Sequence, residues 1–184
     1  NHPLSDRRIK LHQPIEVLGK TVGLIGGSGR IGSVVADLCH ANGLHVLVND
    51  LKKSPKYPTL ELEEMLPRCD FLSLHLPAGD RPIISAREVE LMKQGAGLIN
   101  TSRAVLVDEK VVMEGIECGK LRGYGRDVYK PEPPPKGYLG IGVFTDTGHN
   151  AFRTVESLEK LLNGMFLATV ALYNRDYRHI VNHW

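Results

Sequence analysis

The chain has 184 residues, of which 42% are hydrophobic and 24% charged, the composition of a globular protein with one sizeable core. A formal charge of +2 gives no basis for a nucleic-acid or anionic-membrane partner, and no apolar run approaches the ~20 residues that span a bilayer. Cys39, Cys69 and Cys118 lack metal-ligand spacing and are odd in number, so we expect reduced thiols, no metal site and a cytoplasmic protein.

In chain order, short apolar runs alternate with helical patterns, which predicts an α/β fold with a doubly wound parallel sheet. Residues 1–18 are polar and are expected to be a linker that arrives from another domain. We expect strands at 21–25, 44–50, 70–77, 95–100, 122–129 and 141–145. We expect helices at 30–43, 60–66, 85–93, 107–120 and 154–177.

Local signals mark the ends of several of these helices. Ser85 and Glu88 have the spacing of a capping box, in which each side chain bonds the other residue's backbone amide. Asp108 is expected to cap the next helix, and Gly43 to close the first helix in a left-handed conformation. The first helix carries one apolar face, made of Ile31, Val34, Val35 and Leu38.

A glycine-rich turn separates the first strand from the first helix. The run from Gly27 to Gly32 fits the dinucleotide-binding pattern G-x-G-x-x-G. In that interpretation Gly27 makes the tight turn, Gly29 lets a pyrophosphate touch the backbone, and Gly32 lets the helix pack close to the strand. Gly26 is an additional glycine that lengthens the turn or ends the strand. The alternative is a tight turn without a ligand.

An acidic residue stands where the sugar of a dinucleotide would lie. Asp50 ends the second expected strand, and a carboxylate there receives the two hydroxyls of the adenosine ribose. Because a carboxylate repels a 2′-phosphate, Asp50 favours NAD over NADP. Lys52 and Lys53 stand close by and act against that preference. The alternative for Asp50 is a solvated loop residue.

Three polar residues lie where strands should end at the binding edge of such a sheet, and together they suit reduction of a 2-keto acid. Arg103 offers a planar fork for a carboxylate, and His149 can exchange a proton near neutral pH. Glu132 would orient the imidazole and favour its charged form. Taken singly, the arginine is equally a surface ion-pair partner and the histidine a structural residue.

The stretch from about Leu18 to Ala151 resembles the NAD-binding domain of the D-isomer-specific 2-hydroxyacid dehydrogenases. The likeness is carried by "LGKTVGLIGGSGRIG", "CDFLSLHLP", "LMKQGAGLINTSRAVLVDEKVV", "GKLRGYGRDVYKPEP" and "TGHNAF". It implies that Arg103, Glu132 and His149 are the catalytic arginine, glutamate and histidine. The sequence departs from the family at Arg126, where a small or apolar residue is usual.

The resemblance also implies which residues contact NAD. The implied contacts are Arg30 and Ile31 at the pyrophosphate, Asp50 at the ribose, Leu76 and Pro77 near the adenosine half, Thr101 and Ser102 beside the nicotinamide, and Asp127 at its carboxamide. It further implies a homodimer that forms through this domain.

On this basis residues 1–18 are a linker from a substrate domain largely absent from the chain, 19–152 a Rossmann-type NAD-binding domain, and 153–184 a helix that returns to the substrate domain. The expected activity is hydride transfer between the nicotinamide and a small D-2-hydroxy or 2-keto acid. The alternative is a non-catalytic module that senses NAD(H), as in co-repressor relatives of this fold.

Overall fold

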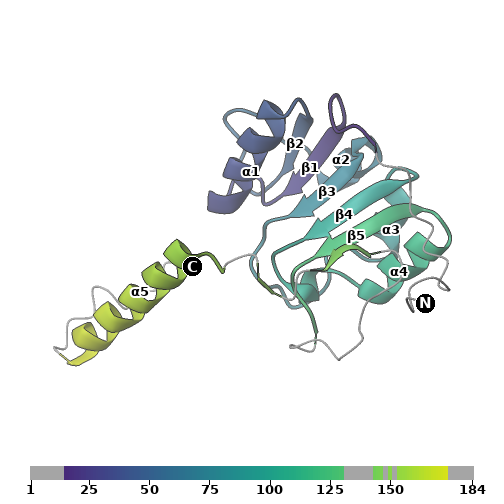
Figure 1. The fold of residues 1–184 in the computed structure, drawn as a ribbon. Coiled ribbons are helices and arrows are strands. Elements are labelled where there is room, and N and C mark those ends of the chain that lie inside the picture. The colour runs from purple at the N-terminus through teal and green to yellow at the C-terminus, as the bar shows by residue number, and fades with distance from the viewer. Residues whose placement is uncertain (1–14, 131–142, 147–148, 151–152, 174–184) are drawn as a thin grey trace, which may run out of the picture. The chain divides into compact units, whose positions relative to one another are not determined.

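The computed structural model describes residues 15–130, 143–146, 149–150 and 153–173, and the chain divides into two units, Asn1–Gly148 and His149–Trp184. The first unit contains a six-stranded parallel sheet with the order β2-β1-β3-β4-β5-β6 (Figure 1). Its strands are β1 (Thr21–Ile25), β2 (His45–Asn49), β3 (Phe71–Leu74), β4 (Ala96–Asn100), β5 (Leu121–Arg126) and β6 (Val143–Asp146).

The strand order confirms the predicted doubly wound fold. The chain runs outward from β1 to β2 and then crosses back to β3, which pairs with the other side of β1. The later strands continue outward on that side, each parallel to the one before. The order therefore reverses at β1, and ligands of such sheets bind at the carboxyl edge beside that point.

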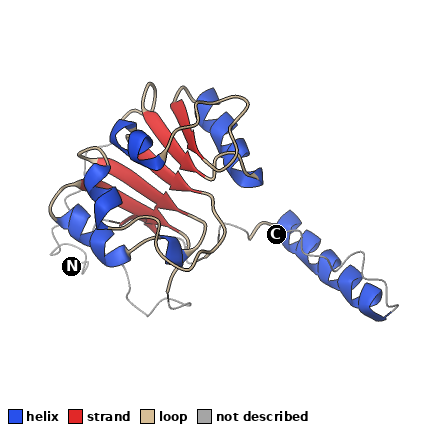
Figure 2. Ribbon diagram, turned by 180° about the vertical axis from the view of Figure 1, so that it is seen from behind, coloured by secondary structure: helices blue, strands red, loops and turns tan. Residues whose placement is uncertain are grey.

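The helices of the first unit are divided between the two faces of the sheet. Helix α1 (Arg30–Ala41) packs on β1 and β2 in a cluster that includes Val22, Leu24, Ala36 and Val48. The larger core forms on the opposite face, shown from behind in Figure 2. The elements on that side are α2 (Leu62–Met65), α3 (Ala86–Leu91), α4 (Glu109–Glu117) and the 3₁₀ turns η1 (Leu66–Arg68) and η2 (Ala104–Leu106).

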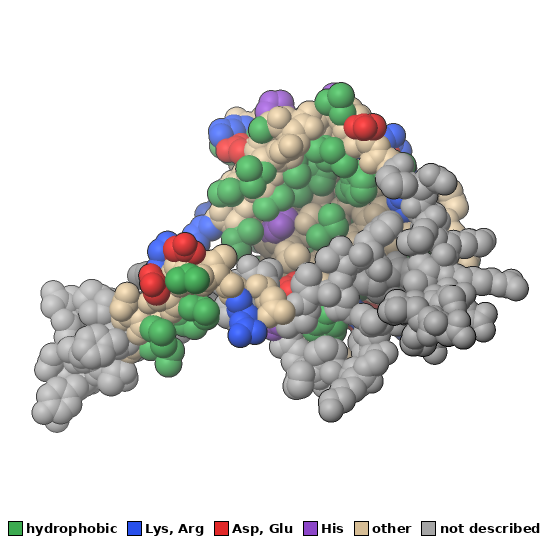
Figure 3. Space-filling model, in the orientation of Figure 1, with side chains coloured by type: hydrophobic (Ala, Val, Ile, Leu, Met, Phe, Trp, Pro, Cys, Tyr) green, Lys and Arg blue, Asp and Glu red, His purple; other side chains and the backbone are tan. Residues whose placement is uncertain are grey.

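Only part of the apolar face predicted for helix α1 packs on the sheet, because Val35 is the one of its four residues that contacts the cluster. Gly32 and Ala36 are the buried residues, whereas Ile31, Val34 and Leu38 are 68%, 56% and 59% exposed. A Cβ at Gly32 would lie 2.2 Å from the Gly26 carbonyl oxygen, so the start of α1 lies too close to the glycine turn for any side chain at this position. Larger side chains are therefore turned outward, and Figure 3 shows hydrophobic side chains on the surface along α1.

Both predicted N-terminal caps are confirmed. The Ser85 backbone N–H donates to a Glu88 carboxylate oxygen at 3.0 Å, and the Ser85 side chain completes the capping box of α3. The Val111 N–H donates to Asp108 Oδ1 at 3.4 Å at the start of α4. Gly43 closes α1 with a φ of +80°, as predicted.

The described part of the second unit contains helix α5 (Val155–Tyr173). At its start the Thr154 hydroxyl accepts a 3.1 Å bond from the Ser157 N–H. Several of its large apolar side chains are exposed, namely Val155, Leu158, Leu161, Leu162 and Met165. Within the described residues no helix, α5 included, has the length and apolarity needed to cross a membrane.

Candidate functional site

The turn between β1 and α1 has its left-handed residue one position earlier than the motif predicts. Gly26 has a φ of +79°, whereas Gly27 is not among the glycines with positive φ, so the tight turn is at Gly26. A Cβ at Gly26 would lie 2.4 Å from the His75 carbonyl oxygen. Gly27 is needed for packing instead, because a Cβ there would lie 2.9 Å from both methyl carbons of Val48.

The same turn leaves open space in front of the first turn of α1. A Cβ at Gly29 would meet only the Gly26 carbonyl oxygen, at 3.2 Å. The first bond within the helix runs from the Ser33 N–H to the Gly29 carbonyl at 2.9 Å, so the three preceding amides lie ahead of it. Amides at a helix start, in front of an open backbone, form the kind of cradle that binds a pyrophosphate. The glycine loop therefore fits a dinucleotide.

Asp50 lies directly beside this loop. The Ser28 N–H donates to Asp50 Oδ2 at 2.9 Å, and the Lys52 N–H donates to Asp50 Oδ1 at 3.3 Å. The Ser28 hydroxyl in turn donates to the Lys52 carbonyl at 2.9 Å. The structure thus brings the glycine loop and the acidic residue together, as a dinucleotide site requires.

Arg30 and Ile31 are the first two residues of α1, and the remaining predicted cofactor contacts follow β3, β4 and β5 at the same edge of the sheet. Leu76 and Pro77 follow β3 and line a hollow of about 470 Å³ that also includes Ile83 and Leu106. Thr101 and Ser102 follow β4. Asp127 follows β5, is buried, and donates its N–H to the Asn100 carbonyl at 3.2 Å.

Asn100, a residue that sequence reasoning missed, holds the loop after β4. It is fully buried, its Nδ2 donates to the Arg103 carbonyl at 2.9 Å, and its Oδ1 accepts from the Ser102 N–H at 3.0 Å. The Ser102 hydroxyl also donates to the Leu74 carbonyl at 2.6 Å, which ties the loop to β3. The signal for this role was the polar residue at the end of the apolar run "GLIN".

Arg126 is buried against α4. Its Nη1 donates to Glu109 Oε1 at 2.9 Å, and its guanidinium lies 4.9 Å from the centre of the Tyr129 ring. In the register of the sheet it stands opposite Asn100, which places it on the same face as that residue. An opposite charge and an aromatic ring thus accommodate the arginine that departs from the usual family pattern.

His75 was also not predicted as a site residue. It follows β3, and its Nε2 lies 3.1 Å from the Ser73 hydroxyl oxygen. Burial lowers the pKa of the His75 imidazole, so the neutral ring is favoured. The ring therefore acts as a hydrogen-bonding group at this edge near neutral pH.

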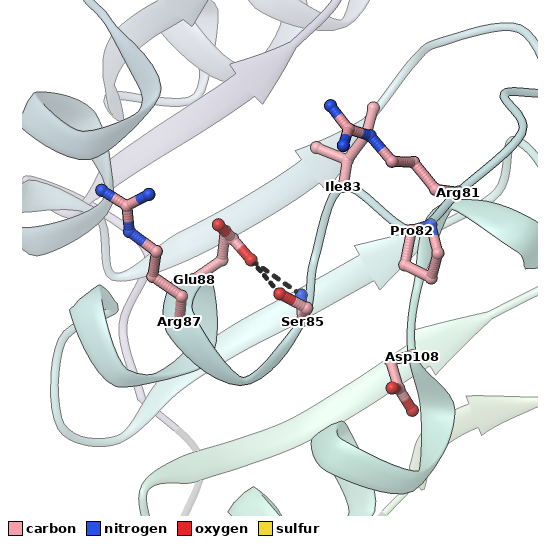
Figure 4. Close-up of a pocket in the computed structure, with 7 residues that line it drawn as sticks. All are labelled: Arg81, Pro82, Ile83, Ser85, Arg87, Glu88 and Asp108. Carbon is pink, nitrogen blue, oxygen red and sulfur yellow. Dashed lines mark hydrogen bonds between the residues drawn. The ribbon is translucent and has the colours of Figure 1, made fainter.

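A second hollow, of about 620 Å³, lies at the start of α3 and is lined by none of the predicted site residues. Figure 4 shows its seven lining residues, with Glu88 turned toward Ser85. Those two side chains are occupied in capping α3. This hollow therefore adds nothing to the dinucleotide site.

The three predicted catalytic residues fall in separate parts of the chain. Arg103 is exposed in the first unit and donates through Nη1 to the Ser102 carbonyl at 2.7 Å. Glu132 lies outside the described residues. His149 belongs to the second unit, where it has a φ of +61°. Within the described part of the chain no group of His, Cys, Asp and Glu has the arrangement of a metal site.

Comparison with known proteins connects this geometry to a family. The sequence model of the D-isomer specific 2-hydroxyacid dehydrogenase NAD binding domain matches residues 5–151. The chain belongs to this family. Its cofactor is accordingly NAD, in agreement with the glycine loop and Asp50.

Individual members of the family show how much of their length the chain covers. D-3-phosphoglycerate dehydrogenase 1 of Saccharomyces cerevisiae is 38% identical over 158 residues, which cover 78% of this chain and 33% of that protein. Hydroxypyruvate reductase of Thermotoga maritima is 37% identical over 155 residues, covering 79% of this chain and 50% of the reductase. The chain thus spans about a third to a half of the length of these relatives.

A solved structure supports the same assignment. D-lactate dehydrogenase from Aquifex aeolicus, complexed with NAD and lactic acid, superposes with a TM-score of 0.78 at 29% identity. The superposition covers 94% of this chain and 60% of that one. The fold of the NAD-binding domain is therefore shared with a dehydrogenase that binds both a dinucleotide and a hydroxy acid.

Proposed function

We propose that this NAD-binding domain is the cofactor-binding half of a dehydrogenase that interconverts small D-2-hydroxy acids and 2-keto acids. The observation that carries the proposal is the Ser28–Asp50 bond, which joins an open glycine loop to the acid expected at the ribose. Family membership supplies the reaction class.

The residues of the chain have separate roles in this proposal. The amides at the start of α1 hold the pyrophosphate, and Asp50 holds the adenosine ribose. The nicotinamide, when bound, supplies or accepts the hydride. The Arg103 guanidinium binds the substrate carboxylate and polarises its 2-oxygen.

The proton that accompanies the hydride is assigned to His149. Its imidazole would donate the proton to the oxygen of a keto acid and take it back in the reverse reaction. Glu132 would orient the ring and favour its charged form. The exposed position of Arg103 supports this arrangement, because a substrate carboxylate can reach its guanidinium from solvent.

We also propose the division of the chain stated above. In this proposal residues 1–18 link the domain to a substrate-binding half, 19–152 bind NAD, and 153–184 return to that half. The assembly is a cytoplasmic homodimer formed through the NAD-binding domain. The length ratio to the relatives supports a second half on which substrate choice depends.

The alternative is a module that binds NAD(H) without turnover. The observation that favours it is that the glycine loop, Asp50 and Lys52 are bonded to one another without any contribution from the three proposed catalytic residues.

One assay distinguishes the two functions. The purified chain is mixed with NADH and a panel of small 2-keto acids, and NADH consumption is followed at its absorbance band. A dehydrogenase consumes NADH, and His149→Ala or Arg103→Ala abolishes turnover while leaving NADH binding intact. His45→Ala, at the amino end of β2, serves as the matched control and keeps full activity. Tight NADH binding without turnover supports the sensor or a cofactor-binding half that lacks its substrate-binding half, and turnover restored by the full-length protein identifies the half-enzyme.

A further inference from the structure

Ser28 is an additional residue within the glycine motif when the motif is aligned to begin at Gly26. Without it, the chain would read Gly26-Gly27-Gly29-Arg30-Ile31-Gly32, which still fits G-x-G-x-x-G. In that reading the first glycine is Gly26, the one with positive φ, as the tight turn requires. Ser28 is therefore inserted between the turn and the residue that faces the pyrophosphate.

The inserted residue makes two hydrogen bonds to the loop after β2, and neither is directed at the start of α1. Its N–H donates to Asp50 Oδ2 and its hydroxyl donates to the Lys52 carbonyl, both at 2.9 Å. The Lys52 N–H donates to the other oxygen of Asp50. Ser28 and Lys52 together hold the Asp50 carboxylate from both sides.

We propose that Ser28 is a positioning residue that sets the preference for NAD over NADP by fixing the carboxylate of Asp50. This inference rests on the dinucleotide site of the proposed function. An ionised carboxylate has about four acceptor positions, and the two backbone amides occupy two of them. The remaining two match the two hydroxyls of an unmodified ribose.

Charge makes this positioning selective. Lys52 and Lys53 are both exposed and stand within three positions of Asp50, so the loop contains cations that suit a 2′-phosphate. A fixed Asp50 places a negative charge where that phosphate would lie. Loss of Ser28 removes its bonds to Asp50 and to the Lys52 carbonyl. The Asp50 carboxylate can then turn away, and Lys52 and Lys53 can approach the ligand. The chain then accepts NADPH more readily and binds NADH less tightly.

The test measures binding of NADH and NADPH to the 184-residue chain by fluorescence titration. The variants are a deletion of Ser28 and Ser28→Ala, which removes only the hydroxyl bond. Ser33→Ala is the matched control, because its exposed hydroxyl lies on the adjacent turn of α1 and has no bond to the β2 loop. The measured quantity is the ratio of the two dissociation constants, which a general loss of stability does not change.

We expect the preference for NADH to fall about tenfold in the deletion and about threefold in Ser28→Ala, and to be unchanged in Ser33→Ala. An unchanged ratio in a folded deletion variant overturns the inference. Where circular dichroism shows that the deletion variant is unfolded, an unchanged ratio in Ser28→Ala overturns it instead. A wild-type chain that binds neither dinucleotide refutes the proposed function, and the inference with it.

Discussion

Replacing Gly29 by valine tests the glycine loop as a binding surface separately from its role in packing. The Gly29 backbone has φ −73° and ψ 175°, an extended conformation open to any residue. A Cβ there would meet only the Gly26 carbonyl, at 3.2 Å, so that carbonyl has to shift by a few tenths of an ångström to admit the new side chain. Because valine is a poorer N-cap than glycine, we expect a loss of about 1 kcal/mol in the free energy of unfolding.

The cost to ligand binding is larger, because the new methyl groups project into the space expected for the pyrophosphate. Removing the close backbone approach disrupts charged hydrogen bonds, each worth about 1.5–3 kcal/mol. We therefore expect the NADH dissociation constant, measured by calorimetry, to rise at least about tenfold. An unchanged affinity in folded Gly29→Val would refute the assignment of this loop to the pyrophosphate.

Gly32→Ala serves as the comparison, because it is expected to lower the stability of the fold rather than the affinity for NADH. Its Cβ would lie 2.2 Å from the Gly26 carbonyl oxygen and 2.8 Å from Gly27 Cα, and both neighbours are backbone. Overpacking costs about 1–3 kcal/mol, partly offset by about 1 kcal/mol from better helix propensity. We expect the thermal midpoint to fall by several degrees, about 3 °C per kcal/mol for a chain of this size. Gly125→Ala, whose Cβ would lie 3.9 Å from its nearest neighbour, should change neither property.

Three further outcomes are expected. Asn100→Ala should lower the free energy of unfolding by about 2 kcal/mol in a urea titration, because buried partners in the loop after β4 lose their hydrogen bonds. Iodoacetamide at pH 8 should label exposed Cys118 well before Cys69, since burial raises the pKa of the Cys69 thiol to about 12; equal rates would contradict this burial. Burial lowers the pKa of His75 in the folded state, so its contribution to stability is present above pH ~6.5 and is lost as the pH falls. His75→Gln should therefore show a shallower loss of stability between pH 7 and pH 5 than the wild type.

The order of elements could be predicted from the sequence because each local signal agreed with the fold. Apolar runs marked the strands, and the caps at Ser85 and Asp108 lie where their spacing placed them. The packing face of α1 could not be predicted from apolar residues. Its fully buried residues are Gly32 and Ala36, flanked by the half-buried Val35 and Cys39, because close approach selects small side chains at the centre of the contact.

The candidate site was predictable to different degrees at its two ends. At the adenosine end, the glycine loop and Asp50 were both predicted from the sequence. The structure places them side by side and joins them through the Ser28 N–H. Asn100 escaped prediction because its hydrogen bonds go to backbone atoms of the loop that follows it. Such bonds leave no charge pattern or spacing, and the sequence signals them only by a polar residue at the end of the apolar run "GLIN".

The position of the tight turn shows why motif spacing alone is ambiguous in this chain. Four glycines in seven residues allow two alignments with G-x-G-x-x-G, one that begins at Gly27 and one that begins at Gly26 with Ser28 inserted. Only the backbone distinguishes them, because a turn that ends a strand in this way needs positive φ and Gly26 has it. The residue left over by that alignment is the one that bonds Asp50. An additional residue that only lengthened the loop would not be expected to bond Asp50, whereas Ser28 bonds both Asp50 and the Lys52 carbonyl.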